Sequence, residues 1–227
     1  MKTKTKVILG VAIAIIIGLF AYNKMNAEEL SGNFSLGYNS ELSFRGVAAE
    51  TSAIQSSLGL DANIFGLDIG LGAATNIKDV GKNETRLSAQ TGVKVLDSVS
   101  TSVGVVKYSN NHAVGDDAEL FIVLGAEIIL SPGVKLFYNP SEAHTTVEGS
   151  VSQVIEITDE ISVEAVGSVG NTTIGGDWGL YYGLDVSAGY SLGDNTKAYI
   201  GIDLKDLKDI NIEAPELAFV AGVTRTF

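Results

Sequence analysis

Strict alternation of apolar and polar residues constrains the fold of this chain more than any other feature. In the clearest stretch, 178–192, every second residue from Trp178 to Leu192 is apolar, and most residues between them are Gly, Ser or Asp. Successive side chains of a β-strand point to opposite faces, so a period of two predicts strands with one apolar and one polar face. The pattern recurs from Asn33 to Phe227 with no convincing helical period, and it predicts an all-β protein.

Turn signals divide this region into about twelve strands. The connections alternate between tight turns, such as Asp97-Ser98, and longer loops, such as Asn76–Glu84 and Lys205–Glu216. Short turns at one end and long loops at the other are typical of an antiparallel up-and-down β-barrel in a membrane, with both chain ends on the periplasmic side. The predicted strands are 32–46, 53–62, 67–75, 85–96, 99–108, 118–130, 133–138, 144–157, 161–170, 178–192, 196–204 and 217–227.

The first 27 residues form a separate segment. Lys2, Lys4 and Lys6 precede an apolar run from Val7 to Ala21, and Ala27 provides a small residue for cleavage. This pattern predicts a signal peptide over 1–27 and a barrel over 28–227, with an uncleaved anchor as the alternative. The segment carries four lysines and no acid, so the net charge of −12 becomes −16 without it.

Three features indicate that the apolar face points outward, into lipid. The polar face is rich in Gly, Ser, Asn and acidic residues, which suits a crowded or wet lumen. Twelve strands enclose more volume than side chains readily fill. The last strand ends on Phe227, which resembles the aromatic assembly signal of bacterial outer-membrane proteins. We therefore expect a transmembrane barrel in the outer membrane, with lipid and the barrel-assembly machinery as partners; a soluble secreted β-protein is the alternative.

An outward apolar face places a set of charged residues toward the lumen. Acids outnumber bases in this set by ten to five, which favours passage of cations or neutral polar solutes. The alternative is a lumen sealed by mutually paired side chains. Arg45, Arg86 and Lys94 are candidates for a basic counter-stripe. The predicted lumen residues are Glu41, Arg45, Asp61, Asp68, Arg86, Lys94, Glu119, Glu127, Lys135, Glu148, Glu156, Glu164, Asp185, Lys197 and Asp203.

Aromatic residues near strand ends predict a girdle at the membrane interfaces. The candidates are Phe34, Tyr38, Phe44, Phe65, Tyr138, Trp178, Tyr190 and Phe219.

Composition excludes several other functions. The chain has no cysteine and only two histidines, His112 and His144, so neither thiolate nor His-rich metal sites are expected. The acidic charge argues against nucleic-acid binding. No motif singles out a serine beside a histidine, so we predict no enzymatic activity, no cofactor and no metal. Asp116 and Asp117 fit a solvated turn better than a weak calcium site.

Short motifs add a family resemblance. The segments Phe44-Arg45-Gly46, Leu58–Asp61, Ala118–Phe121 and Ser131–Tyr138 resemble those of uncharacterised proteobacterial barrel proteins of the Gcw_chp type. The resemblance implies secretion and an outer-membrane barrel, and it brings no established substrate or catalytic residue. It singles out Arg45, which either braces the lumen or lines a solute site.

Two functional hypotheses follow from the sequence. The first is a small porin or channel that passes small polar or cationic solutes by passive diffusion. The second is a structural or surface-interaction barrel whose lumen is blocked by side chains, and whose long loops face outside.

Overall fold

The structure of the protein is a computed structural model that describes residues 30–45, 47–48, 51–64, 67–79, 81–111, 116–141, 143–174, 177–193, 195–208 and 217–227. The predicted signal peptide, 1–27, and its junction with residue 28 lie outside this part of the chain, so both stay predictions. None of the described residues belongs to a helix long and apolar enough to cross a membrane.

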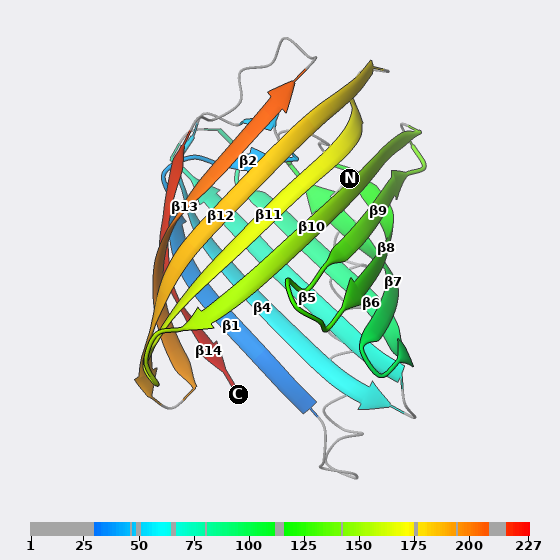
Figure 1. Ribbon diagram of the computed structural model, residues 1–227. Coiled ribbons are helices and arrows are strands. Elements are labelled where there is room, and N and C mark those ends of the chain that lie inside the picture. The colour runs from blue at the N-terminus through cyan, green and yellow to red at the C-terminus, as the bar shows by residue number, and fades with distance from the viewer. Residues whose placement is uncertain are drawn as a thin grey trace.

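Twelve antiparallel strands form a closed barrel, which confirms the predicted fold class (Figure 1). Each barrel strand pairs with its neighbours along the chain, and the first strand pairs with the last. Closure satisfies the backbone hydrogen bonds of every strand and leaves no open edge. The strands are β1 (Leu30–Asn39), β4 (Ala53–Ile64), β5 (Leu67–Lys78), β6 (Glu84–Leu96), β7 (Val99–Ser109), β8 (Ala118–Ala126), β9 (Gly133–Asn139), β10 (His144–Glu156), β11 (Ile161–Ile174), β12 (Asp177–Gly193), β13 (Thr196–Lys208) and β14 (Ala218–Thr226).

The apolar face of the barrel points outward and the polar face inward. Along β8, Leu120, Ile122 and Leu124 are exposed on the outer surface, whereas Glu119 between β7 and β9 is only 1 % exposed. Large apolar side chains are exposed in the same alternating way on other strands, including Leu36 on β1. An outer surface of this kind suits lipid.

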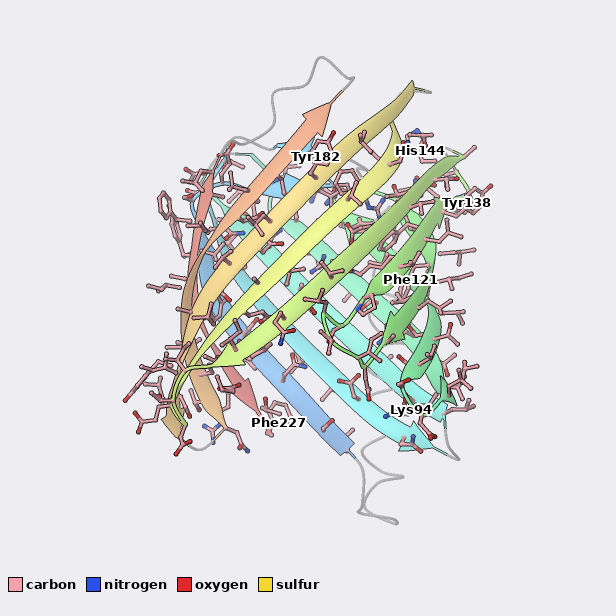
Figure 2. The ribbon with its side chains drawn as sticks, in the orientation of Figure 1. Lys94, Phe121, Tyr138, His144, Tyr182 and Phe227 are labelled. Atoms are coloured by element: carbon pink, nitrogen blue, oxygen red, sulfur yellow. The ribbon has the colours of Figure 1, made fainter. Side chains whose placement is uncertain are left out.

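Aromatic side chains of the predicted girdle are exposed near both ends of the barrel. Tyr138, a predicted member, lies near the end that carries the longer connections, and so does Tyr182, which was not predicted (Figure 2). Phe227, also not predicted for the girdle, lies exposed at the other end (Figure 2). Phe65 and the side chain of Trp178 lie outside the described residues. Phe44 was wrongly predicted for the girdle, because it points into the barrel and stacks on Tyr108. The exposed aromatic residues are Phe34, Tyr38, Tyr138, Tyr182, Tyr190, Phe219 and Phe227.

The terminal residue closes the seam between the first and last strands. Phe227 and Gly32 exchange two backbone hydrogen bonds of 2.9 Å, and the Phe227 ring covers Gly32 so closely that a Cβ there would lie 2.6 Å from it. Leu60 borders the same position from β4. The ring therefore packs on the outer face of the seam, while the role of Phe227 as an assembly signal stays a prediction.

Several strand ends differ from the prediction. The first strand ends at Asn39 instead of 46, and β8 ends at Ala126 instead of 130. At the second site, Leu130 and Ser131 adopt positive φ, and Ser131 N–H donates to the Ile128 carbonyl, which forms a turn before Pro132.

Other strands are longer than predicted, so the loop asymmetry is weaker. The ladder of β12 and β13 continues to Lys208, and the connection between β11 and β12 comprises only residues 175–176. The connections 40–52, 110–117 and 209–216 are still longer than the turns 65–66, 97–98 and 194–195 at the opposite end. An outward apolar residue, Ile77, marks one such extension, since the alternation continues through it to Lys78.

Candidate functional site in the barrel lumen

A short hairpin between β1 and β4 lies inside the barrel. It consists of β2 (Ser43–Phe44) and β3 (Val47–Ala48), which pair only with each other. Figure 1 shows β2 in the upper half of the barrel, behind β12. Leu42 is buried beside it, and Phe44 meets the ring of Tyr108 edge-on at 5.5 Å. The hairpin is thus packed against the inner face of β7 by apolar contacts.

Arg45 at the tip of the hairpin binds the barrel wall. Its two terminal nitrogens each donate to one carboxylate oxygen of Glu119 on β8, both at 2.7 Å, and one also donates to Thr146 Oγ1 on β10 at 3.3 Å. The guanidinium lies over the rings of Phe44 and Phe137, at 4.5 and 4.1 Å from their centroids. A bidentate pair with two flat ring contacts holds the side chain in one orientation. Arg45 therefore braces the hairpin.

Further side chains fill the same side of the lumen. Lys135 on β9 pairs with Glu148 on β10 at 3.1 Å, and the hydroxyl of Tyr181 on β12 donates to Glu148 at 2.8 Å. Thr146 and Thr172 share a buried hydrogen bond of 2.6 Å. We call the inner face of β7–β12, together with the hairpin, the hairpin-latched wall.

The opposite side carries mostly small residues. Ser35 on β1 and Ser57 on β4 share a hydrogen bond of 2.6 Å, and Gly59, Gly72 and Ser88 continue this face around β4, β5 and β6. We call the inner face of β1, β4, β5 and β6 the small-residue wall. A cavity of about 170 Å³ lies against it, lined by Asn33, Ser57, Leu58, Gly59, Gly72, Ala73, Ala74, Arg86 and Ser88.

A second cavity, of about 200 Å³, lies where the hairpin faces the small-residue wall. Leu42 and Phe44 border it from the hairpin, and Asn39 and Asp203 border it from β1 and β13. The two cavities share Ala74 and Arg86. Arg86 makes no ion pair or hydrogen bond with any described residue, so its guanidinium is available between the two spaces.

Further ion pairs lie along the inner face of the barrel, within one strand or between neighbouring strands. Lys205 contacts Asp203 at 2.7 Å and Asp185 at 3.7 Å, and Lys78 contacts Glu84 at 2.6 Å. Lys78, Glu84 and Lys205 were not among the predicted lumen residues, because the turn signals placed all three in long loops. The continued apolar alternation at Ile77 and Leu204, just before the two lysines, was the signal that could have placed them on strands.

These lysines reduce the acidic excess that the sequence predicted for the lumen.

The prediction of a basic counter-stripe is also wrong. Arg45 belongs to the hairpin and not to a strand, and Lys94 lies eight residues from Arg86 along β6, which is about 27 Å at the usual rise. Figure 2 shows Lys94 at the lower end of the barrel, where it makes an exposed pair with Glu127 at 3.5 Å.

The other predicted lumen residues divide into two groups. Glu41 and Glu127 do not lie on strands: the first is in the connection after β1, and the second follows the end of β8. Lys197 donates to Ser162 at 2.6 Å, and Asp68 accepts from Asn63 at 2.7 Å. The residues that lie on strands with the inward parity are Asp61, Asp68, Arg86, Lys94, Glu119, Lys135, Glu148, Glu156, Glu164, Asp185, Lys197 and Asp203.

Two apolar residues on the polar face of β8 mark the docking position of the hairpin. Phe121 and Val123 break the alternation in the sequence, and Phe121 packs on Phe137 at 6.1 Å between centroids. Phe137 in turn contacts Arg45. An apolar break in an inward face was therefore the sequence signal for an internal packing partner.

Asp117 ties the rim above the hairpin-latched wall together. Its carboxylate accepts hydrogen bonds from Asn139 Nδ2 at 2.8 Å, Ser141 Oγ at 3.0 Å and the Ala118 amide at 2.7 Å. Partial burial raises the pKa of Asp117, but these hydrogen bonds outweigh it, so the pKa lies below its usual value. Asp117 is thus a structural acceptor and not a freely solvated turn residue.

Comparisons with known proteins bear on the fold. No protein-family model and no curated protein matches the chain, so the Gcw_chp-type resemblance stays a prediction. Among solved structures, the chain is similar to the KdgM porin (12 % identity, TM-score 0.59, 86 % of this chain and 99 % of that one) and to the NanC porin (13 %, 0.55, 86 % and 98 %). It is also similar to an outer membrane channel from Pseudomonas putida F1 (10 %, 0.52, 88 % and 95 %). At these identities the likeness shows the fold, which is that of bacterial outer-membrane barrels.

Proposed function

We propose that the protein is a small channel of the bacterial outer membrane that passes small polar solutes by diffusion. Its outer surface is apolar with aromatic residues at both ends, which suits lipid, and its inner surface is polar. The porins and the channel with the same architecture support this function as an analogy of fold.

The observation that carries the proposal is the asymmetry of the lumen. The hairpin is held against β8 and β10 by Arg45, on one side of the barrel. The other side is lined by Gly, Ala and Ser, and the two cavities there meet at Ala74 and Arg86. An internal segment that is fixed to one wall narrows a pore while small residues on the other wall keep space for solutes.

Planar-bilayer recording tests this proposal. We expect stepwise single-channel currents with a small preference for cations. Asp61, Glu156 and Glu164 make no ion pair with any described residue, whereas among the lumen bases only Arg86 and Lys197 lack such a pair. Unpaired acids therefore outnumber unpaired bases. Protein that inserts, shows the heat-modifiable gel mobility of a folded barrel and gives no current steps would overturn the channel.

A blocked barrel is the second candidate, and a specific observation favours it. Tyr181, Glu119 and Thr146 are almost fully buried on the hairpin-latched wall, so side chains fill a large part of the upper lumen. In that case the barrel supports loops for surface interaction and conducts nothing. Releasing the hairpin with the double substitution R45A/E119A would then produce currents that the wild type lacks, whereas a channel conducts before and after.

We infer that the protein is not an enzyme. His144 lies at the start of β10, near the rim in Figure 2, and His112 lies outside the described residues. No group of three or more metal-ligating side chains occurs within the described ranges. A diffusion channel needs no such groups, and incubation with ester or glycoside substrates is expected to leave them unchanged.

A further inference from the structure

We propose that the cavity of about 170 Å³ on the small-residue wall is a binding subsite for a small monocarboxylate, with Arg86 as the residue that holds the carboxylate. This inference rests on the proposed channel function, since it names a class of solute that the passage would take. It is drawn from an exposed, unpaired guanidinium and from the neutral groups around it.

The pairing register places Arg86 at the border of a floor made of small residues. Ala74 lies between Arg86 and Ser57 in one row across β4, β5 and β6, and Gly72 lies beside Ser88 in the next inward row. Neighbouring strands are about 4.8 Å apart, so about 10 Å separates the backbone of β6 from that of β4 across this floor. The Arg86 side chain takes up part of this distance, which leaves room for a solute of a few carbon atoms.

The guanidinium of Arg86 is accessible and has no partner. The side chain is exposed and borders both lumen cavities, at the register position opposite Tyr108 on β7. It forms no ion pair or hydrogen bond with any described residue. A guanidinium presents its donors in a planar fork that matches the two oxygens of a carboxylate, so a carboxylate solute would accept two parallel hydrogen bonds here.

The charge around Arg86 favours an anion. Among the described residues that line the cavity of about 170 Å³, Arg86 alone is charged. The adjoining cavity of about 200 Å³ adds two acids, but both are already engaged. Lys78 contacts Glu84 at 2.6 Å. Lys205 contacts Asp203 at 2.7 Å. The positive charge of Arg86 is therefore uncompensated on the side of the small-residue wall, where an anion gains more than a neutral or cationic solute.

The unpaired acids of the lumen lie away from this cavity, so the subsite is compatible with a small cation preference of the whole pore. Asp61 is four residues along β4 from the row of Arg86, which is about 13 Å at the usual rise and exceeds the Debye length of about 8 Å. Glu156 and Glu164 flank the tight turn between β10 and β11. Small inorganic ions respond to the field of the whole lumen, whereas a carboxylate also gains the two hydrogen bonds of the fork.

Neutral groups give the cavity further hydrogen-bonding positions and set the size of the solute. Ser88 and Asn33 line it, and neither side chain hydrogen-bonds to a described residue. Ser57 lines it as well, and its hydroxyl shares one bond with Ser35 and keeps a further bonding position. A cavity of about 150 Å³ accommodates benzene, so about 170 Å³ is enough for a hydroxylated carboxylate of about six carbon atoms or fewer. A second negative charge would find no counter-charge here, which favours a monocarboxylate.

Binding to the full barrel in a neutral detergent tests the subsite independently of conduction. The probes are lactate, lactamide and 1-amino-2-propanol, which are similar in size and differ in charge. We expect saturable binding by ligand-observed NMR, tightest for lactate. The substitution R86Q removes the fork and should weaken lactate binding about tenfold. K197Q removes the same charge from a lumen lysine that donates to Ser162 outside this cavity, so it should leave the binding unchanged.

The outcomes distinguish the subsite from the channel. Current steps without saturable lactate binding, equally tight binding of either other probe, or equal lactate affinity of R86Q and the wild type would overturn the subsite and leave the channel in place. An equal loss in K197Q would also overturn the subsite, because the charge of the whole lumen would then account for the binding.

Binding without current steps would overturn the channel and the transport of the carboxylate, while the subsite would stand. If R86Q lacks the heat-modifiable mobility of a folded barrel, A74L provides the second variant. Its larger side chain fills the floor between Arg86 and Ser57, so the same loss of lactate binding is expected.

Discussion

The two walls of the lumen are built from the same alternating strands but with different residues, and this difference explains the architecture. The hairpin-latched wall buries Tyr181, Glu119 and Thr146 almost fully and adds an internal hairpin held by Arg45. The small-residue wall instead presents small side chains such as Ser57 and Gly72 to the lumen, with a cavity beside them. The comparison shows that a barrel can be braced on one side only, which leaves room for solutes on the other.

The largest expected effect comes from breaking the brace. The substitution E119A leaves the Arg45 guanidinium buried without its carboxylate, and loss of one partner of a buried pair destabilises by about 3–5 kcal/mol. We expect the hairpin to leave the wall instead, so single-channel conductance should rise and become noisier. The matched control is E127A, which removes the partner of Lys94 from a pair whose side chains are 60 % and 68 % exposed. Unchanged conductance in E119A would contradict the brace.

Next in size is the effect of filling the small-residue wall. Ser57 lines the cavity of about 170 Å³, so S57W should occupy it and reduce conductance severalfold. The same substitution at Ser168, on β11 of the hairpin-latched wall, should have a smaller effect, because that side contributes less to the passage. Single-channel recording of both variants checks this comparison. A larger loss in S168W than in S57W would reverse our assignment of the two walls.

A pair of Gly-to-Ala substitutions compares the packing of the walls. A Cβ on Gly170 would collide with the ring of Tyr181, which is held by Glu148, so G170A should destabilise the barrel by about 1–3 kcal/mol. A Cβ on Gly72 would meet only the Ser88 hydroxyl, at 2.5 Å, which can rotate away. Since Gly in a strand interior is less stable than Ala by about 0.5–1 kcal/mol, G72A should be neutral or slightly stabilising. Urea unfolding of both variants in detergent measures the difference.

The smallest effect concerns the rim of the hairpin-latched wall at low pH. Asp117 has a lowered pKa, so it contributes stability that is complete above its unfolded pKa of about 3.8 and is lost as the pH falls through the folded value. The melting temperature of the wild type should therefore drop toward that of D117N below about pH 4. A constant difference between the two proteins from pH 7 to pH 2.5 would show that the Asp117 charge does not hold the rim.

Much of the barrel could be predicted from the sequence, because a period of two reports directly which side chains share a face. The shared face of residues such as Glu148 and Asp185 follows from that period, and the turn signals between the alternating stretches gave the twelve strands. The outward direction of the apolar face followed from the composition of the polar face, the strand number and the final aromatic residue. Strand ends were less predictable. Neither Asn39 nor Ala126 is a strong breaker, and the strands stop there because a hairpin turns inward after one and a turn with positive φ follows the other.

The arrangement inside the lumen could not be predicted in the same way. Arg45 and Glu119 are 74 residues apart, and their pairing depends on a hairpin that folds back across the barrel. The local sequence of Phe44 and Arg45 continues the alternation, so it predicted a girdle aromatic and an inward strand residue. Only the apolar break at Phe121 hinted that something packs against β8 from inside.

Alternation along the chain thus determined by itself that this protein consists of β-strands with one apolar and one polar face, since the two-residue period allows no other amphipathic element. The composition of the polar face, the number of strands and the final aromatic residue then indicated that the apolar face is the exterior of a barrel. The tertiary structure decided which side of the interior is filled. That outcome depends on contacts between strands that are far apart in sequence, such as the Arg45–Glu119 pair, and on the volume that each inward side chain occupies after closure. Local pattern carries neither distance across the lumen nor volume, so the brace, the cavities and the unpaired Arg86 emerged only from the folded barrel.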